Sequence, residues 1–183
     1  MRGEHLNRPS QRLRCDGVGH LAHCDIVVLG LGSNLGESRK IILAAIKAAK
    51  EFLTESRCSS LYETDPLYVT DQNRFINAAV SGFFSGTAYE LLRIINEIEA
   101  SFGRDRSLER RWGERPLDID ILLFGGQRIN EKTLVIPHPR LKERRFALEP
   151  LLELVPDAVE PGTGLSYKTI CDALPNQGVK LLT

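Results

Sequence analysis

Two aspartates, Asp118 and Asp120, stand one residue apart in the otherwise apolar run LDIDILLF. In a β-strand alternate side chains share a face, so both carboxylates would point the same way, about 6.5–7 Å apart along the strand. Two like charges on an apolar strand are costly to bury. Magnesium prefers oxygen ligands and commonly binds one or two carboxylates together with substrate phosphates. The pair therefore predicts a magnesium–phosphate site, with two solvated acids on an edge strand as the alternative.

Basic residues surround this pair in the sequence. One cluster precedes the strand and a second follows it: Arg104, Arg106, Arg110, Arg111 and Arg115, then His138, Arg140, Lys142, Arg144 and Arg145. Arginine binds phosphate oxygens through paired, permanently charged contacts. Any single one of these arginines would ordinarily be only a solvated loop residue. Two clusters around an acid pair, in a chain of zero formal net charge, favour a polyphosphate–metal site.

Two further residues suggest a planar ligand. Trp112, the only tryptophan, lies inside the charged loop, where its ring could stack on another ring. Asn77 could offer a donor and an acceptor to the edge of a heterocycle, with a turn residue at a strand end as its alternative role. Gly30-x-Gly32-x-x-x-Gly36 is not a dinucleotide fingerprint, because its spacing differs from G-x-G-x-x-G. The P-loop pattern G-x-x-x-x-G-K-[ST] does not occur.

The composition is that of one globular domain. The chain has 183 residues, 24 Lys+Arg against 24 Asp+Glu, and 42% hydrophobic residues, which excludes a disordered chain and argues against a nucleic-acid-binding protein. The longest apolar stretch, at 26–31, is too short to span a membrane. Four scattered cysteines predict no disulfide scaffold and favour a reducing, cytoplasmic location.

The first 24 residues differ from the rest, since they show no apolar periodicity. We expect residues 1–24 to form a disordered tail and residues 25–183 to form a single domain. Within the tail Cys15, His20, His23 and Cys24 could gather a zinc ion, but their spacing matches no established zinc pattern. The tail interpretation is therefore preferred over a zinc site.

Six elements must position the acid pair and the arginines. Apolar patterns predict strands at 26–31, 59–64, 78–85 and 117–124, and a helix over 37–53. A second helix runs from the capping box Thr87-Ala-Tyr-Glu90 to Gly103. This order predicts an α+β fold with a ferredoxin-like βαββαβ core, in which helices pack on an antiparallel sheet. Short helices from 146 and near 168–174 predict a C-terminal helical extension.

Four sequence blocks occur together in one order: Gly32-Ser33-Asn34-Leu35, Asn77-Ala78-Ala79-Val80, the run from Arg111-Trp112-Gly113 through Arg115-Pro116-Leu117-Asp118-Ile119-Asp120-Ile121, and Ile136-Pro137-His138-Pro139. In these blocks the chain closely resembles the 6-hydroxymethyl-7,8-dihydropterin pyrophosphokinase family of folate biosynthesis, over roughly residues 26–175. The resemblance implies a kinase that transfers a pyrophosphoryl group from ATP to the pterin hydroxymethyl oxygen, releases AMP, and uses two magnesium ions. It also implies a ferredoxin-like core.

The resemblance assigns roles by position. Asp118 and Asp120 would hold both metals and, with Arg104 and Arg115, form the catalytic group. The nucleotide-contacting set would comprise Asn96, Glu99, Arg104, Arg106, Trp112, Arg115, Ile121, His138 and Arg144. The pterin-contacting set would comprise Thr64, Leu67, Phe75, Asn77, Trp112, Asp118 and Phe146. Gln72 would lie in a loop that moves over the site.

The chain departs from the family pattern at three positions. Phe75 replaces a common tyrosine, and Thr133 and Pro139 replace an Arg and a Tyr of some members. The binding partners expected from the resemblance are ATP and the pterin. We expect a monomer that binds neither nucleic acid nor membranes.

Overall fold

The computed structural model describes residues 25–66, 71–104 and 114–182. In chain order the elements are β1 (Asp25–Ser33), α1 (Ser38–Lys50), β2 (Thr54–Cys58), β3 (Leu61–Thr64), β4 (Phe75–Phe84), α2 (Ala88–Ser101), β5 (Asp118–Phe124), β6 (Ile129–Asn130), β7 (Val135–Ile136), the 3-10 turn η1 (Leu141–Glu143), α3 (Arg145–Leu154), α4 (Tyr167–Ala173) and β8 (Lys180–Leu182). The expected tail and its zinc candidates lie outside the described residues.

The main sheet has the order β5-β1-β4-β3-β8, and β2 also pairs with β4. β1 is antiparallel to both of its neighbours, β4 and β5. The chain thus passes from β1 through α1 to the β2–β3–β4 segment and through α2 to β5. The predicted α+β class and its antiparallel sheet are confirmed.

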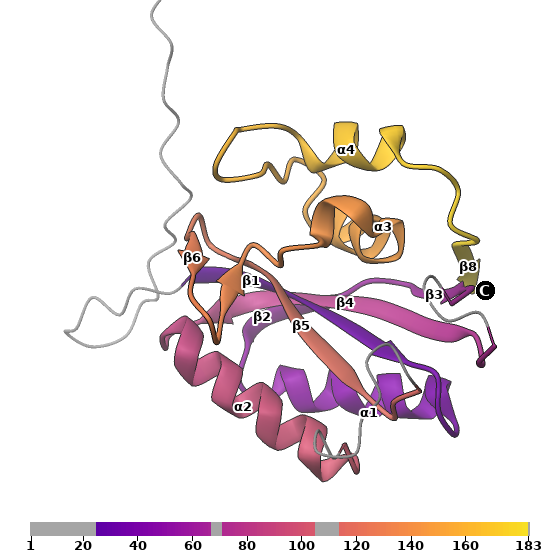
Figure 1. Ribbon diagram of the computed structural model, residues 1–183. Helices are drawn as coiled ribbons and strands as arrows, with labels where there is room; N and C mark the ends of the chain where they lie inside the picture. The colour runs from indigo at the N-terminus through magenta and orange to yellow at the C-terminus, as the bar shows by residue number, and fades with distance from the viewer. Residues whose placement is uncertain (1–24, 67–70, 105–113, 183) are drawn as a thin grey trace, which may run out of the picture.

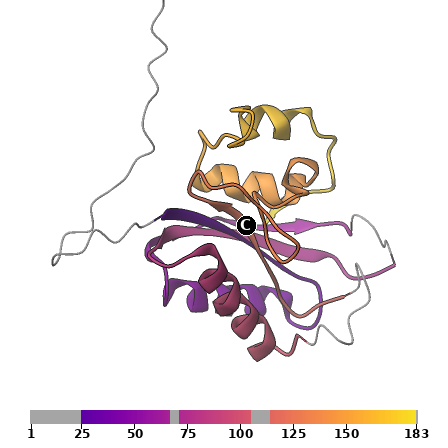
Figure 2. The same ribbon diagram turned by 60° about the vertical axis from the view of Figure 1, so that its left-hand side comes forward.

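The sheet lies between two helical layers, as Figures 1 and 2 show from two directions. α1 and α2 cover one face, where Leu29, Ile95 and Phe124 belong to one buried cluster. α3 covers part of the other face, where Val28, Leu122 and Leu148 belong to a second cluster, and α4 packs on α3. Because α3 covers only part of its face, the rest of that face is left for the site.

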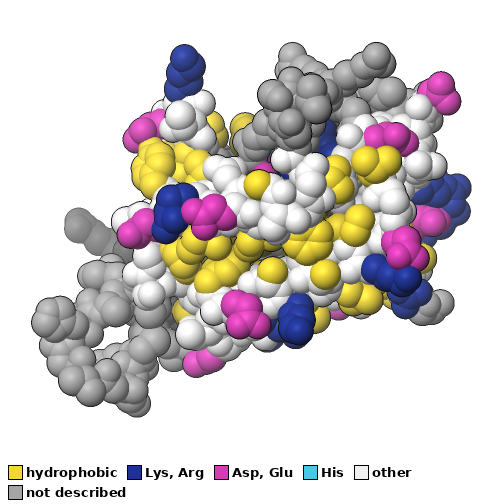
Figure 3. Space-filling view, turned by 90° about the horizontal axis from the view of Figure 1, so that it is seen from below, with side chains coloured by type: hydrophobic (Ala, Val, Ile, Leu, Met, Phe, Trp, Pro, Cys, Tyr) yellow, Lys and Arg dark blue, Asp and Glu magenta, His cyan; other side chains and the backbone are white. Residues whose placement is uncertain are grey.

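The two predicted long helices form as the sequence indicates. The capping box at α2 is present in full: Thr87 Oγ1 accepts from the Glu90 amide at 3.2 Å, and Glu90 Oε2 accepts from the Thr87 amide at 2.7 Å. The outer side of α1 and α2 mixes charged and hydrophobic side chains (Figure 3), including the half-exposed Leu43 and Tyr89. No helix in the described part of the chain is long and apolar enough to cross a membrane.

Two strand predictions need correction, and some strands were not predicted. The strand predicted at 59–64 begins at Leu61, because Ser59 interrupts the ladder on β4: its hydroxyl accepts from the Ala79 amide at 2.8 Å. The strand predicted from 78 begins at Phe75, since Phe75 pairs with Thr64 of β3. β2, β6, β7 and β8 were not predicted. β2 reads TESRC and has no apolar alternation, so only the edge of β4 makes it a strand.

Candidate active site

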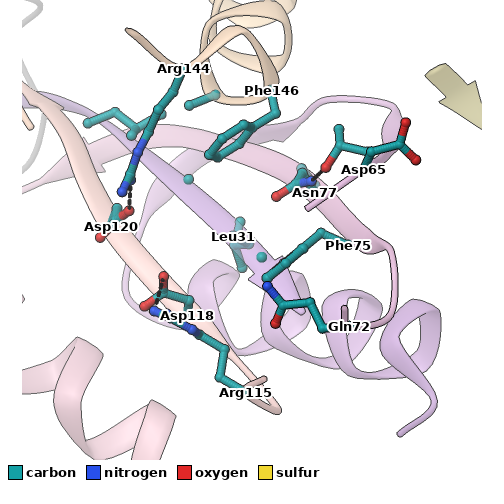
Figure 4. A pocket seen from close by; sticks show the side chains of 16 residues that line it. Leu31, Asp65, Gln72, Phe75, Asn77, Arg115, Asp118, Asp120, Arg144 and Phe146 are labelled. Atoms are coloured by element: carbon teal, nitrogen blue, oxygen red, sulfur yellow. Dashed lines mark hydrogen bonds and ion pairs between the residues drawn. The ribbon is translucent and has the colours of Figure 1, made fainter. Parts of the chain in front are cut away.

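A pocket lies on the sheet face that α3 leaves uncovered (Figure 4). Side chains from β3, β4, β5 and the start of α3 form its walls, together with residues of the 71–74 loop. Its lining comprises Gly30, Leu31, Gly32, Thr64, Asp65, Gln72, Phe75, Asn77, Ala78, Arg115, Asp118, Asp120, Leu122, Arg144, Phe146 and Ala147. Most of the residues assigned to catalysis or pterin binding that the structure describes are therefore in one place.

The floor of the pocket is made by β1. Leu29 and Leu31 point into the α1–α2 layer, so the alternate residues Gly30 and Gly32 face the pocket. A Cβ atom on Gly30 would lie 3.1 Å from a methyl of Leu122, and one on Gly32 would lie 3.2 Å from Asn77 Oδ1. The two glycines keep the floor flat and open. This role explains why they are two residues apart, and no dinucleotide-binding motif is needed.

One end of the pocket combines aromatic surface with an amide. Phe75 and Phe146 are on its walls, and Asn77 is almost fully buried between β1 and β3. Asn77 Nδ2 donates to Thr64 Oγ1 at 2.8 Å, which fixes the orientation of the amide. This arrangement suits a flat heterocycle with polar edges.

Asp118 and Asp120 stand on the pocket face of β5, as the alternation predicts. Their neighbours Ile119 and Ile121 are buried in the opposite layer. The Ile121 side chain therefore points away from the pocket, and only its backbone could reach a nucleotide on the pocket side.

Asp118 is paired with two arginines. Arg104 Nη1 donates to Asp118 Oδ1 at 2.5 Å, and Arg115 Nη1 donates to Asp118 Oδ2 at 2.9 Å. Arg104 Nη1 also donates to the buried Glu99 carboxylate, which accepts from the Ile119 amide at 2.8 Å as well. Glu99 thus lies behind Arg104 and supports it.

Asp120 contacts the second basic cluster. Arg144 Nη1 donates to Asp120 Oδ2 at 3.1 Å, and His138 Nε2 lies 3.7 Å from the same oxygen. The Arg144 guanidinium also lies over the Phe146 ring, 5.6 Å from its centroid. Arg144 therefore links the acid pair to the aromatic end of the pocket.

The two carboxylates have opposite pKa shifts. Burial raises the pKa of Asp118, but the charges of Arg115 and Arg104 outweigh this and hold it below its usual value. Burial and the neighbouring Asp118 charge raise the pKa of Asp120 to about 7. Burial and the Arg144 charge lower the pKa of His138 to about 4, so this imidazole is neutral near pH 7 and can accept a hydrogen bond.

The acidic and basic groups of this cluster fit a magnesium–phosphate ligand. Glu99, Asp118 and Asp120 face three guanidiniums, those of Arg104, Arg115 and Arg144. The guanidiniums therefore contact the same carboxylate oxygens that a metal cation would bind. No group of three His, Cys, Asp or Glu side chains in the described residues forms a complete metal cage. Two carboxylates plus phosphate oxygens and water are the donors that magnesium accepts.

The other predicted site residues divide into three groups. Asn96 is on the exposed side of α2, one turn before Glu99, away from the pocket lining. Thr133 and Pro139, where the chain departs from the family pattern, are exposed and also lie outside the pocket lining. Leu67, Arg106 and Trp112 lie outside the described residues, as do Arg110 and Arg111.

Sequence reasoning missed Asn34 and Asp65. Asn34 is buried, and its Nδ2 donates to Gln72 Oε1 at 3.1 Å, so it helps to hold the loop at one wall. Asp65 follows β3 directly and lines the same wall. The position of Asn34 in the block Gly32-Ser33-Asn34-Leu35 was the one available signal for it.

The sequence pattern of one protein family, described as 7,8-dihydro-6-hydroxymethylpterin-pyrophosphokinase (HPPK), matches residues 28–156. The chain belongs to this family. Among HPPK relatives, the 2-amino-4-hydroxy-6-hydroxymethyldihydropteridine pyrophosphokinase of Bacillus subtilis is 41% identical over 132 residues, which cover 71% of this chain and 78% of the relative. The Pseudomonas aeruginosa enzyme of the same name is 41% identical over 159 residues, covering 85% and 96%.

Longer HPPK relatives exist as well. The mitochondrial folate synthesis bifunctional protein of Arabidopsis thaliana is 45% identical over 138 residues, which cover 75% of this chain but only 24% of that protein. The chain thus spans about a quarter of the length of this relative. A crystal structure of an HPPK-DHPS protein in complex with substrates matches with a TM-score of 0.66 at 16% identity, covering 82% of this chain and 43% of that one. It supports the fold assignment.

Proposed function

We propose that this chain transfers the pyrophosphoryl group of ATP to the hydroxymethyl oxygen of 6-hydroxymethyl-7,8-dihydropterin and releases AMP. One observation carries the proposal: a cluster of three carboxyl groups and three guanidiniums borders a pocket with a glycine floor and an Asn77 amide. The cluster suits a polyphosphate with its metal, and the adjoining pocket suits a flat heterocycle.

Each group has a task in this proposal. Asp118 and Asp120 would hold magnesium, which would supply neutralisation of phosphate charge and a lowered pKa of the attacking hydroxyl. Arg104, Arg115 and Arg144 leave their carboxylates and bind phosphate oxygens. Such a partner exchange keeps every buried charge paired during binding. We propose two magnesium ions per site, as the family resemblance implies.

The pterin ring lies on the glycine floor in this proposal. Asn77 and Thr64 contact its edge, while Phe75 and Phe146 contact it from the walls. The neutral His138 accepts or donates a hydrogen bond near the phosphates without adding charge. Arg106, Trp112, Leu67 and Asn96 keep the roles that the family resemblance gives them. Ile121 contacts the nucleotide only through its backbone, and the buried Glu99 acts on it through Arg104.

The test is AMP formation from ATP by the purified chain, with magnesium, in the presence and absence of 6-hydroxymethyl-7,8-dihydropterin. Pterin-dependent AMP is the expected product. ADP would indicate ordinary kinase chemistry and contradict the proposal. Binding of both ligands without AMP would indicate a binding protein instead. Asp120→Ala should abolish the reaction, and wild-type turnover in that variant would also contradict the proposal.

The oligomeric state and the location are part of this proposal. We propose that the enzyme is a monomer. The wide spacing of the four cysteines supports a cytoplasmic location. Sedimentation of the purified chain at assay concentration tests the first point, since a dimer would contradict it.

A further inference from the structure

The helix α3, which contributes Phe146 and Ala147 to the pocket lining, begins without a local cap. Arg144 is the residue before the first turn of α3, and its side chain makes no capping hydrogen bond. Its guanidinium is used instead at Asp120. The first amides of a helix lack partners within the helix, so the start of α3 needs an acceptor from elsewhere.

Gln177, from the segment between α4 and β8, supplies that acceptor. Its Oε1 accepts from the Arg145 amide at 2.9 Å, and its Nε2 donates to the Glu143 carbonyl at 2.8 Å. The two contacts lie on either side of Arg144. One side chain, 32 residues away in sequence from Arg145, therefore holds the backbone before and after Arg144.

Neighbouring contacts fix Gln177 itself. The Arg145 guanidinium donates to the carbonyls of Leu174 at 3.0 Å and Cys171 at 3.3 Å, which ties the end of α4 to the start of α3. On the other side, Lys180–Leu182 pair with β3 as strand β8. The segment that carries Gln177 is thus held at both ends.

We propose that Gln177 is a positioning residue for Arg144. By fixing the backbone on both sides of Arg144, it directs the guanidinium toward Asp120 and the phosphate position, between Phe146 and the acid pair. A misplacement of about 1 Å at such a group can cost about a hundredfold in rate. The inference rests on the proposed function, because it gives Gln177 its effect through a phosphate-binding arginine.

The experiment is a double-mutant cycle with Gln177→Met and Arg144→Ala. Methionine keeps the length of glutamine and removes both hydrogen bonds. We expect Gln177→Met to lower kcat/KM for ATP about tenfold to a hundredfold. Once Arg144 is already alanine, the same substitution should change kcat/KM less than about twofold. Gln177→Glu keeps the acceptor for the Arg145 amide and should retain more activity than Gln177→Met. Lys180→Met, an exposed change in β8, is the control.

The same cycle is measured on ATP binding without pterin, and thermal unfolding is recorded for each variant. Additive losses in the two backgrounds, or an unchanged kcat/KM in a folded Gln177→Met, would overturn the positioning role. If the wild type binds magnesium and ATP but forms no AMP, the proposed reaction fails, and the binding cycle still decides Gln177. If the wild type binds no ATP, both the function and this role are overturned.

Discussion

Asn34 forms hydrogen bonds with both the backbone amide and the backbone carbonyl of Arg115. The Arg115 amide donates to Asn34 Oδ1 at 3.0 Å, and the Arg115 carbonyl accepts from the Asn34 amide at 3.3 Å. Asn34 Nδ2 meanwhile donates to Gln72 Oε1 at 3.1 Å. One buried amide therefore connects the end of β1 to two pieces of chain that border the pocket, one of which carries an arginine of the charge cluster.

Asn34→Ala should affect both stability and catalysis. The substitution leaves the Arg115 amide without its acceptor, which costs about 1–3 kcal/mol when a buried group loses its partner. We expect a lower denaturation midpoint and a kcat that falls more than the affinity for ATP. Asn73→Ala is the control, since Asn73 donates to Glu114 at an exposed position. Equal effects of the two substitutions would contradict the connecting role of Asn34.

Neutralising Asp118 or Asp120 should lower the stability of the protein by different amounts, although both aspartates are needed for turnover. Asp118→Asn breaks the pairs with Arg104 and Arg115 and should destabilise the magnesium-free protein by about 3 kcal/mol. Asp120→Asn removes the repulsion that raises the pKa of Asp120, so it should destabilise much less. Urea denaturation without magnesium measures both. The reverse order of stabilities would contradict the pairing seen here.

The glycine floor predicts a selective loss of pterin binding. A Cβ atom on Gly32 would lie 3.2 Å from Asn77 Oδ1 and would stand in the pocket. Gly32→Ala should therefore weaken pterin binding at least about tenfold while leaving ATP binding close to that of the wild type. Gly126→Ala, whose Cβ atom would meet nothing within 4 Å, is the control. Calorimetric titration with each ligand separates the two affinities.

Glu160 gives the loop between α3 and α4 a pH-dependent stability. Hydrogen bonds from the Thr163 hydroxyl and from the Gly162 and Thr163 amides hold the pKa of Glu160 below its usual value, although burial opposes them. A depressed carboxyl pKa stabilises the fold above the unfolded value of about 4.3, and this contribution is lost as the pH falls through the folded value.

Glu160→Gln should therefore be less stable than the wild type near about pH 6, and this difference should shrink toward about pH 3. Thermal unfolding across this range measures the effect. A difference that stays constant down to the acid end would show that ionisation of Glu160 contributes nothing.

Local sequence patterns were sufficient to predict the fold class and the placement of the acid pair on one face of its strand. The alternation around Ile119 places Asp118 and Asp120 on one face because strand geometry has a period of two. The capping box at Thr87 and Glu90 likewise marks the start of α2, since all of its hydrogen bonds are local. Such features need no knowledge of the rest of the chain.

Contacts between distant segments could not be predicted in this way. Glu99 supports Arg104 only because α2 packs beside β5, and Gln177 reaches the start of α3 only because α4 and β8 hold its segment. Glu99 stands at helical spacing on the buried face of α2, but that spacing does not indicate its partner, and Gln177 belongs to no periodic pattern. β2 was missed for the same reason, because its polar sequence forms a strand only beside the edge of β4.

Main-chain atoms at Gly30 and Gly32 form the middle of the pocket floor. An inhibitor that rests on this floor would contact groups that no substitution can delete. A change at Gly30 could only add atoms, the first of them 3.1 Å from Leu122, and would fill the space that the natural ligand needs. Resistance to such a compound would therefore have to arise in the pocket walls, where side chains such as Phe75 and Phe146 can change size.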